Sequence, residues 1–318
     1  MKDGIIIYQQ QAGNLFRQKT SAKRLATGFQ FAEGPLWHPG GYLLFSDVKA
    51  NRIFQLFLSG VIHVLRERSG SQYVCGKYLS EMIGSNGLAL DNEGDLVFCQ
   101  HANHSIAKLN KHKDVFKLCT SYNGRPFNSP NDLVIKSDGG IYFTDPPYGL
   151  QGEILRPEIF QPHAGIYQFQ DNQLSLLSTD FNYPNGICFS ADERYLFVGS
   201  NHPDEKMIMK YLMSSKGIVL SKQVFPSVNA DGIKTDAFNN LYAATDKGVL
   251  ILSPEGKELA LIPLSEPATN LAFGGPEKNL LFITTYHSIY SVEMNMVIHD
   301  LLPARRNPLP LTRTQLYG

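Results

Sequence analysis

The sequence has no excess of charge of either sign. Its 318 residues contain 29 Lys and Arg against 29 Asp and Glu, so the formal net charge is zero. Domains that bind nucleic acid or anionic membranes generally carry a basic excess. The charge balance therefore argues against both kinds of partner.

Long apolar runs are missing as well. The apolar segment near the N-terminus, in MKDGIIIYQQQAGNLF, is too short for a signal peptide, and no later run approaches a membrane span. The sequence has only four cysteines, Cys75, Cys99, Cys119 and Cys188, which lie far apart without paired spacing. This favours reduced thiols in a cytoplasmic protein, although a disulfide between some pair stays open.

Several catalytic motifs are also lacking. The sequence contains no Gly-x-Ser-x-Gly, no phosphate-binding Gly-rich loop, no Gly-x-Gly-x-x-Gly and no Cys-x-x-Cys. Serine-triad, nucleotide and dinucleotide chemistry therefore have no support in the sequence.

What the sequence does have is an internal repeat. Stretches such as AEGPLWHPGGYLLFSD and PNDLVIKSDGGIYFTD each combine a short apolar run, a polar turn and a second β-rich run, which is a hairpin signature. We call the residue that opens each repeat its leading residue. The six leading residues are Glu33, Asn86, Asn131, Asn185, Asp231 and Asn270.

The spacing of the repeats predicts the fold. Successive leading residues lie 39 to 54 residues apart, with further β-rich stretches in each interval and almost no helical periodicity. A period near 40–50 residues with about four strands is typical of a β-propeller. We therefore predict an all-β fold, a six-bladed β-propeller with four-stranded antiparallel blades, as one domain over residues 1–318. Residues 1–30 are expected to close the last blade.

The leading residues indicate a metal site. In a propeller the innermost strands start at one mouth of the central channel, so these six side chains should meet there. Asn-Gly and Asp-Gly are common turn dipeptides, which explains any one position alone. Turn chemistry explains the set poorly, because all six carry a carboxylate or amide oxygen. A divalent cation would neutralise two carboxylates that otherwise repel each other.

Oxygen ligands select a hard cation. We expect one divalent cation, Ca²⁺ first, with Mg²⁺, Mn²⁺ or Zn²⁺ as alternatives. A zinc site at His101 and His104 is disfavoured, because the two residues do not share a helix face. The segment DNEGD, residues 91–95, looks faintly like a calcium loop, but it lacks the closing Glu and should lie at the opposite mouth.

The segments that follow each second strand should line the same entrance as the leading residues. They supply candidates for a polar rim over the metal. These candidates are His101, Asp145, Tyr148, Asn201, His202, Asp246 and Tyr286.

Several of these stretches resemble a known family. FAEGPLW, SNGLALD, NSPNDLVIKSDGGIYFTDPPYG and YPNGICFSADERYLFV are similar to the gluconolactonase and regucalcin (senescence-marker) family, and most similar to the bacterial-type gluconolactonases. The likeness runs from about residue 28 to 294. It implies a six-bladed propeller with a divalent metal in the channel mouth and a lactone as the small-molecule substrate.

The resemblance also implies roles for particular residues. The metal ligands of the family fall on Glu33, Asn185 and Asp231, and Asn131 matches an asparagine that is a further ligand or touches substrate. Asp231 is the expected general base. Asn86 stands where the distantly related paraoxonases have a histidine, which argues against a histidine base.

The expected reaction is metal-assisted hydrolysis of sugar-acid lactones to the free acid. Five side chains are expected to contact the substrate. They are Asn131, Asn86, Asn128, Tyr148 and His101. Two alternatives stay open: the same site acting on other esters or phosphotriesters, and a non-enzymatic calcium-binding propeller. The sequence leaves the oligomeric state undetermined.

Two features depart from the family pattern. The segment 70–84 is longer than the usual link into the second repeat, and we expect it to act on substrate choice as a lid. An arginine that usually follows CQH in the second repeat is absent, and ANHS stands there instead.

Overall fold

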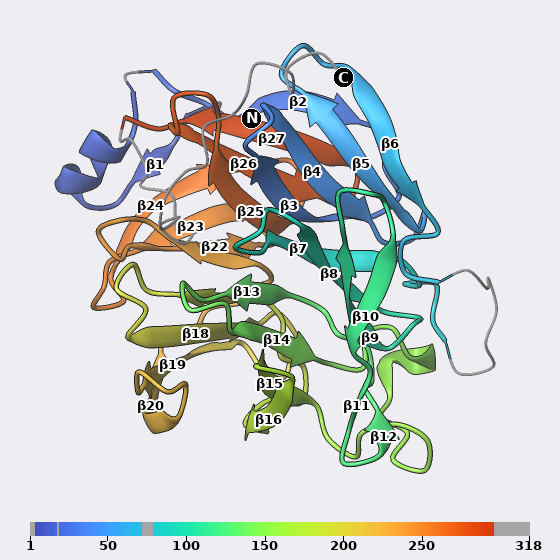
Figure 1. Cartoon of the computed structure of the whole chain (residues 1–318). Helices are drawn as coiled ribbons and strands as arrows, with labels where there is room; N and C mark the ends of the chain where they lie inside the picture. The colour runs from blue at the N-terminus through green and yellow to red at the C-terminus, as the bar shows by residue number, and fades with distance from the viewer. Residues whose placement is uncertain (1–3, 18, 72–78, 296–318) are drawn as a thin grey trace.

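The structure is a computed structural model that describes residues 4–17, 19–71 and 79–295. These residues fold into six antiparallel blades and one short two-stranded sheet (Figure 1). Blades 1 to 4 are each built from four strands in chain order, whereas blades 5 and 6 each add a strand from the N-terminal part of the chain. The predicted all-β fold, a six-bladed propeller with four-stranded antiparallel blades, is confirmed.

The first three blades have the following strands. Blade 1 contains β3 (Ala32–His38), β4 (Tyr42–Asp47), β5 (Arg52–Phe57) and β6 (Ile62–Glu67). Blade 2 contains β7 (Ser85–Leu90), β8 (Leu96–Gln100), β9 (Ser105–Leu109) and β10 (Val115–Cys119). Blade 3 contains β13 (Leu133–Ile135), β14 (Ile141–Asp145), β15 (Gly165–Gln170) and β16 (Gln173–Ser178).

The other three blades complete the ring. Blade 4 contains β17 (Ile187–Phe189), β18 (Tyr195–Ser200), β19 (Met207–Met213) and β20 (Val219–Phe225). Blade 5 contains β21 (Ile233–Thr235), β22 (Leu241–Thr245), β23 (Gly248–Leu252) and β24 (Glu258–Pro263), with β1 (Ile6–Ile7) added at its edge. Blade 6 contains β25 (Ala268–Gly274), β26 (Leu280–Thr285), β27 (Ser288–Glu293) and β2 (Lys23–Thr27).

Three short elements lie outside the blades. They are the hairpin β11 (Ser121–Tyr122) and β12 (Arg125–Pro126), the 3₁₀ helix η1 (Gln10–Leu15) and the 3₁₀ helix η2 (Gln151–Glu153). Among the described residues, no helix is long and apolar enough to cross a membrane.

Blade 6 is shared by the two ends of the chain. Its outer strand β2 pairs antiparallel with β27, so the blue N-terminal strand lies beside the red C-terminal strands in Figure 1. Pairing these strands covers an edge of β27 that would otherwise present unpaired backbone groups. The propeller is therefore closed by hydrogen bonds between distant parts of the sequence.

The hydrophobic core is divided among the blade interfaces. Between blades 4 and 5, for example, Cys188 and Phe197 pack in one cluster with Ile233 and Leu241. Equivalent clusters fill the other interfaces within the described part of the chain. Successive side chains of a strand point to opposite faces of its blade, and each blade buries one face against each of its two neighbours. The core is therefore divided among the interfaces. The channel mouth is thereby left to polar side chains.

The position after the leading residue brings neighbouring innermost strands close together. In blade 4 it is Gly186, whose N–H donates to the Asp231 carbonyl of blade 5 at 2.9 Å. A Cβ atom on Gly186 would lie 2.2 Å from that carbonyl oxygen. Glycine is therefore required for the backbones to meet at this level of the channel.

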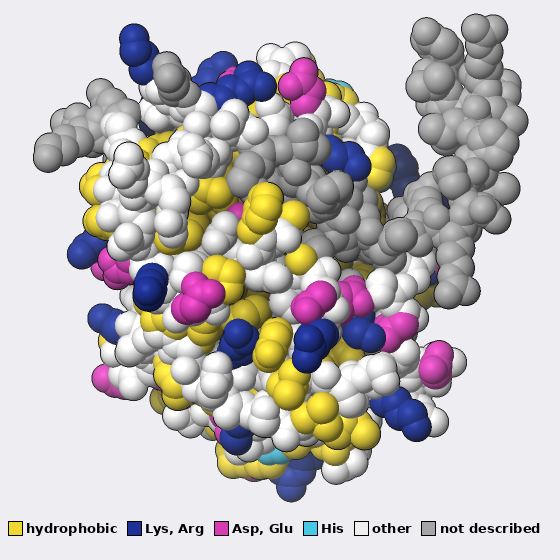
Figure 2. All heavy atoms as spheres, turned by 90° about the vertical axis from the view of Figure 1, so that its left-hand side faces the viewer, with side chains coloured by type: hydrophobic (Ala, Val, Ile, Leu, Met, Phe, Trp, Pro, Cys, Tyr) yellow, Lys and Arg dark blue, Asp and Glu magenta, His cyan; other side chains and the backbone are white. Residues whose placement is uncertain are grey.

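The charge balance of the composition is also visible on the surface. On the face shown in Figure 2, Lys and Arg side chains are interspersed with Asp, Glu and apolar groups. Three cysteines, Cys99, Cys119 and Cys188, are free thiols. Cys75 lies outside the described residues.

Candidate active site

A polar cavity of about 450 Å³ opens at the mouth of the channel where the innermost strands begin. Five of the six leading residues line it, which are Glu33, Asn86, Asn131, Asn185 and Asp231. The repeat thus brings together side chains from five blades that lie far apart in the sequence.

The sixth leading residue, Asn270, does not line the cavity. Its amide donates to Glu33 Oε2 at 3.0 Å and to Asp132 Oδ2 at 3.4 Å. The expectation that all six leading residues face the site is therefore wrong for blade 6. Asn270 instead holds the site residue Glu33 by a hydrogen bond.

Glu33 lies at an irregularity of blade 1. The register between β3 and β4 shifts between Glu33 and Leu36, and Gly34 adopts a φ of 53°. The Gly34 N–H donates to Glu33 Oε2 at 2.6 Å. Because of burial, and then of the negative charge of Asp132, the pKa of Glu33 is raised to about 7. The bulge thus holds a carboxylate inside the channel mouth at a cost in ionisation free energy.

Asp231 is the second buried carboxylate of the cavity. Burial raises its pKa well above the usual range, and the charges of Glu33 and Asp132 raise it further. Both carboxylates are thus destabilised in their charged form by the protein around them. A divalent cation would reverse this effect, because its charge favours ionised carboxylates.

A chain of four side-chain amides from three blades leads to Asp231 in blade 5. Asn86 donates to Asn131 Oδ1 (2.7 Å) and Asn131 donates to Asn185 Oδ1 (2.6 Å). Asn185 then donates to Asn201 Oδ1 (3.2 Å), and Asn201 donates to Asp231 Oδ2 (2.8 Å). When Asp231 is ionised, as a bound cation would favour, its carboxylate only accepts and fixes the direction of the whole chain.

The start of this amide chain has an unsatisfied acceptor. Asn86 Oδ1 is buried and has no hydrogen-bond partner among the described residues. Buried polar groups are rarely left unpaired, so an orphaned oxygen in a cavity points to a bound water, ion or ligand. Together with two carboxylates and further amide oxygens, the donor set fits a hard divalent cation with bound water or substrate.

His101 lies in the cavity wall and is neutral. Its Nδ1 lies 3.0 Å from the Met82 carbonyl, which only accepts, so Nδ1 carries the proton. Nε2 is then free to accept from Asn86 Nδ2 at 3.3 Å. Burial lowers the pKa of His101 to about 4. His101 therefore orients the first amide of the chain and is not a proton carrier near neutral pH.

Loops that follow the second strands form the rest of the wall, as expected for Tyr148, Asn201, His202 and Tyr286. Tyr148 OH donates to Asn201 Oδ1 at 3.0 Å, which ties the wall to the amide chain. The rim prediction thus agrees with the lining for these four residues.

Three predicted residues lie away from the cavity lining. The amide N–H groups of Asn128 donate to Asp145 Oδ2 (3.3 Å) and to the His163 carbonyl (2.9 Å), and its Oδ1 is buried without a partner among the described residues. Asp145 accepts from the backbone N–H groups of Asn128 and Ser129, which fixes the loop. Asp246 is not among the lining residues either.

The segment 70–84 is only partly described, because residues 72–78 lie outside the described residues. Its last part contributes Ser80, Glu81 and Met82 to the cavity wall. Ser80 Oγ donates to the Tyr148 carbonyl at 3.0 Å. The predicted lid itself stays a prediction.

Sequence reasoning missed Asp132. This residue is buried at the position where four of the other blades have glycine, and its carboxylate accepts from the Leu133 N–H at 2.8 Å. Its charge acts on both Glu33 and Asp231. The sequence does show that Asp132 is unusual, because the residue that follows the leading residue is glycine or leucine in the other five repeats.

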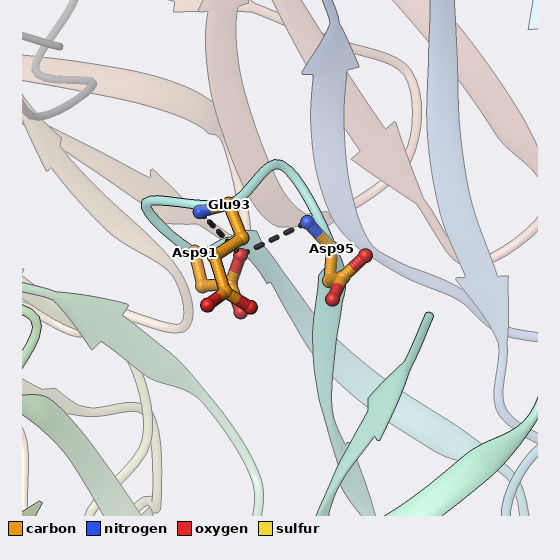
Figure 3. A group of neighbouring side chains, drawn as sticks. All are labelled: Asp91, Glu93 and Asp95. Carbon is orange, nitrogen blue, oxygen red and sulfur yellow. Dashed lines mark hydrogen bonds between the residues drawn. The ribbon is translucent and has the colours of Figure 1, made fainter. Parts of the chain in front are cut away.

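The acidic turn at 91–95 has a different explanation from metal binding. Asp91, Glu93 and Asp95 lie together on the turn between β7 and β8 (Figure 3). Lys108 Nζ lies 2.7 Å from Asp91, 2.6 Å from Glu93 and 3.0 Å from Asp95. The ammonium group thus occupies the centre of the cluster, in agreement with the rejection of a calcium loop here.

A family profile described as "SMP-30/Gluconolactonase/LRE-like region" matches residues 31–287. The chain belongs to this family. The resemblance found in the sequence is confirmed, and the matched region includes every leading residue.

Individual members of the SMP-30/gluconolactonase family are similar over most of the chain. A gluconolactonase of Zymomonas mobilis is 28% identical over 291 residues, which cover 86% of this chain and 81% of that protein. A pentonolactonase of Haloferax volcanii is 23% identical over 84% of this chain and 85% of its own length. The solved structure of a gluconolactonase from Xanthomonas campestris is 25% identical, covers 92% of this chain and 95% of its own, and superposes with a TM-score of 0.80.

Proposed function

We propose that this protein is a metal-dependent lactone hydrolase that opens sugar-acid lactones to the free acid. The similar proteins named above are a gluconolactonase and a pentonolactonase, which supports lactones as the substrate class. The observation that carries the proposal is the cavity itself, with two buried carboxylates of raised pKa and a run of amides that ends on Asp231.

Glu33, Asn185 and Asp231 would hold the cation, with Asn131 as a further ligand, and Ca²⁺ is the ion we propose. Carboxylate and amide oxygens are the ligands that Ca²⁺ prefers. When bound, the cation supplies a Lewis acid that polarises the lactone carbonyl and offsets the negative charge of the oxyanion. It also lowers the pKa values of Glu33 and Asp231 relative to the protein alone.

The residues of the chain then provide positioning and proton transfer. Asp231 accepts the proton of the attacking water through a carboxylate oxygen, while Asn201 holds its Oδ2 by a hydrogen bond. Ring hydroxyls of the substrate are held by Asn86 and Asn131 at the cavity floor and by Tyr148 at the wall. The unpaired Asn86 Oδ1 is an acceptor ready for a hydroxyl.

The proposal is tested by activity and metal binding measured together. Chelation should abolish lactone hydrolysis, and Ca²⁺, Mg²⁺ or Mn²⁺ should restore it. Glu33→Gln and Asp231→Asn should each weaken metal binding, measured by calorimetry, and lower kcat by about 100-fold or more. The matched surface variant Asp138→Asn, which removes a partly exposed carboxylate that pairs with Lys136, should change neither. Full activity of extensively chelated protein would contradict the metal-dependent mechanism.

Substrate choice is tested with matched lactones. A cavity lined by amides and carboxylates rejects ligands that leave these groups unpaired. We expect gluconolactone-type substrates to exceed unsubstituted lactones by at least about tenfold in kcat/KM, equivalent to ~1.4 kcal/mol. A proton-release assay measures both. Equal turnover of the unsubstituted ring would overturn the sugar assignment, and preferential turnover of a phosphotriester would overturn lactones as the substrate class.

A further inference from the structure

A second cavity, of about 170 Å³, opens on the channel away from the candidate active site. It is lined by the residues that stand three positions after each leading residue, together with their neighbours on the same strands. These six residues are Leu36, Ala89, Val134, Cys188, Lys234 and Phe273. Five of the blades thus contribute an uncharged, mainly apolar side chain at this level, and blade 5 contributes a lysine.

The two cavities are separated by buried side chains. Asp132 and Asn270 lie between them, 3% and 2% exposed, with Asn270 Nδ2 3.4 Å from Asp132 Oδ2. At the same level a Cβ atom on Gly87 would lie 2.6 Å from Asp132 Oδ1, so the channel is filled there. Neither Asp132 nor Asn270 lines either cavity. The second cavity is therefore a compartment of its own.

Lys234 places one ammonium group in this apolar compartment. Its Nζ donates to the Ile233 carbonyl at 3.1 Å and lies 3.8 Å from Asp132 Oδ2. The side chain is only 26% exposed. An ammonium has three N–H donors, so donors are available for a ligand from the cavity side. A charge in such surroundings binds an opposite charge more strongly than it would in water.

We propose that this second cavity binds a small monocarboxylate with an apolar tail, with the carboxylate on Lys234 Nζ and the tail against Leu36, Val134 and Phe273. A single negative charge fits, because Asp132 already offsets part of the lysine charge. At the rim, Lys278 and Glu193 contribute one charge of each sign, so they add no net attraction for a dianion. The ligand is chemically unlike the polyhydroxy substrate of the proposed lactonase and needs none of its site residues.

The protein carries its own reporter for this test. Trp37 is the single tryptophan of the chain and lines the second cavity. Octanoate is the probe, and uncharged octanamide is its matched control. Titration of the full chain with octanoate should change the Trp37 fluorescence saturably, with a Kd at least about tenfold below that of octanamide. Absence of saturable binding, or equal binding of the amide, would overturn the proposal.

Variants locate the binding group. Lys234→Met should weaken octanoate at least about tenfold and leave octanamide unchanged, whereas Lys257→Met, which removes an exposed lysine that does not line the cavity, should leave both unchanged. Ala89→Phe should fill the cavity and weaken both ligands, with the melting temperature as a check of folding. Octanoate affinity that survives in Lys234→Met, or that is lost in Lys257→Met instead, would overturn the assignment. Trp37 fluorescence that changes on dilution, with dimers in sedimentation, would identify a second copy as the occupant instead.

Discussion

Hydrogen-bond partners decide the state of individual residues in this protein. The Met82 carbonyl places the single proton of His101 on Nδ1, and burial keeps the ring neutral. Lys108, on the surface turn, is held by three carboxylates and remains charged. Burial therefore determines the charge state of His101, and neighbouring charges determine that of Lys108. We therefore expect substitution of His101 to leave the pH dependence of catalysis unchanged, and substitution of Lys108 to lower the stability of its turn.

Removal of His101 should not alter the pH dependence of catalysis. With a pKa near 4, the ring does not titrate between pH 5.5 and 8. His101→Asn is expected to lower kcat/KM about tenfold, because Asn86 loses one hydrogen-bond partner, and to leave the shape of the pH–rate profile unchanged in this range. If the pH–rate profile of the wild type had a limb with a midpoint near 6.5 that the variant lacked, His101 would be shown to transfer protons.

Removal of Lys108 should destabilise the turn at 91–95. Lys108→Met leaves three carboxylates close together, and we expect the free energy of unfolding to fall by about 1–2 kcal/mol at pH 8. The loss should shrink in about 1 M NaCl, which screens the repulsion between the carboxylates, and in millimolar Ca²⁺. Urea unfolding measures the change, with Lys136→Met, a lysine paired with Asp138, as the control. An equal loss at low and at high salt would exclude carboxylate repulsion as the cause.

At the scale of the strands, the site depends on how closely the innermost strands approach. The N–H of Gly186 bonds to the carbonyl of Asp231, and the N–H of Gly232 bonds to that of Thr269. These contacts join blade 4 to blade 5 and blade 5 to blade 6 directly beneath the cavity. The backbone of Asp231 is thus fixed by its neighbours before its side chain contacts any ligand.

A methyl group at this contact should disturb both stability and activity. In Gly186→Ala the added Cβ meets the Asp231 carbonyl oxygen at 2.2 Å, and backbone cannot rotate away as a side chain can. We expect a loss of about 2 kcal/mol in the free energy of unfolding and a fall in kcat. Gly13→Ala is the control, because nothing lies within 4 Å of its added Cβ. A variant as stable and active as the wild type would show that the strands separate easily.

For the whole molecule, stability should depend on pH through the two buried carboxyl groups of the cavity. The folded pKa values of Glu33 and Asp231 are raised, so the metal-free folded state binds protons more tightly than the unfolded chain does. This contribution to stability is complete below about pH 4.5, the usual pKa of the Glu33 carboxyl, and is lost as the pH rises through about 7.

Metal-free protein should therefore unfold more readily at pH 8 than at pH 5, by roughly 3 kcal/mol for Glu33. Ca²⁺ should stabilise the protein more at pH 8, where it does not compete with protons. Thermal unfolding with chelator or Ca²⁺ at both pH values measures this, and Glu33→Gln should flatten the pH dependence. Stability of metal-free protein that rises from pH 5 to pH 8 would contradict the raised pKa values.

The repeat made much of this molecule predictable from sequence. Once Glu33, Asn131 and Asp231 are recognised as equivalent positions, propeller geometry brings them to one mouth whatever lies between them. The repeat does not determine where a side chain turns after a bulge or in a loop. Asn128 turns to Asp145 because local hydrogen bonds decide its orientation. Such bonds depend on loop conformations that periodicity does not describe.

The closure of blade 6 also bears on how the chain is made. Ser288 Oγ donates to Thr27 Oγ1 across a separation of 261 residues, and β2 has its partner only when β27 exists. During synthesis β2 therefore remains unpaired until almost the whole propeller has left the ribosome. Contacts so distant in sequence form slowly, so ring closure should be a late step of folding. A nascent chain that stops before residue 288 would retain an open ring with two unprotected sheet edges.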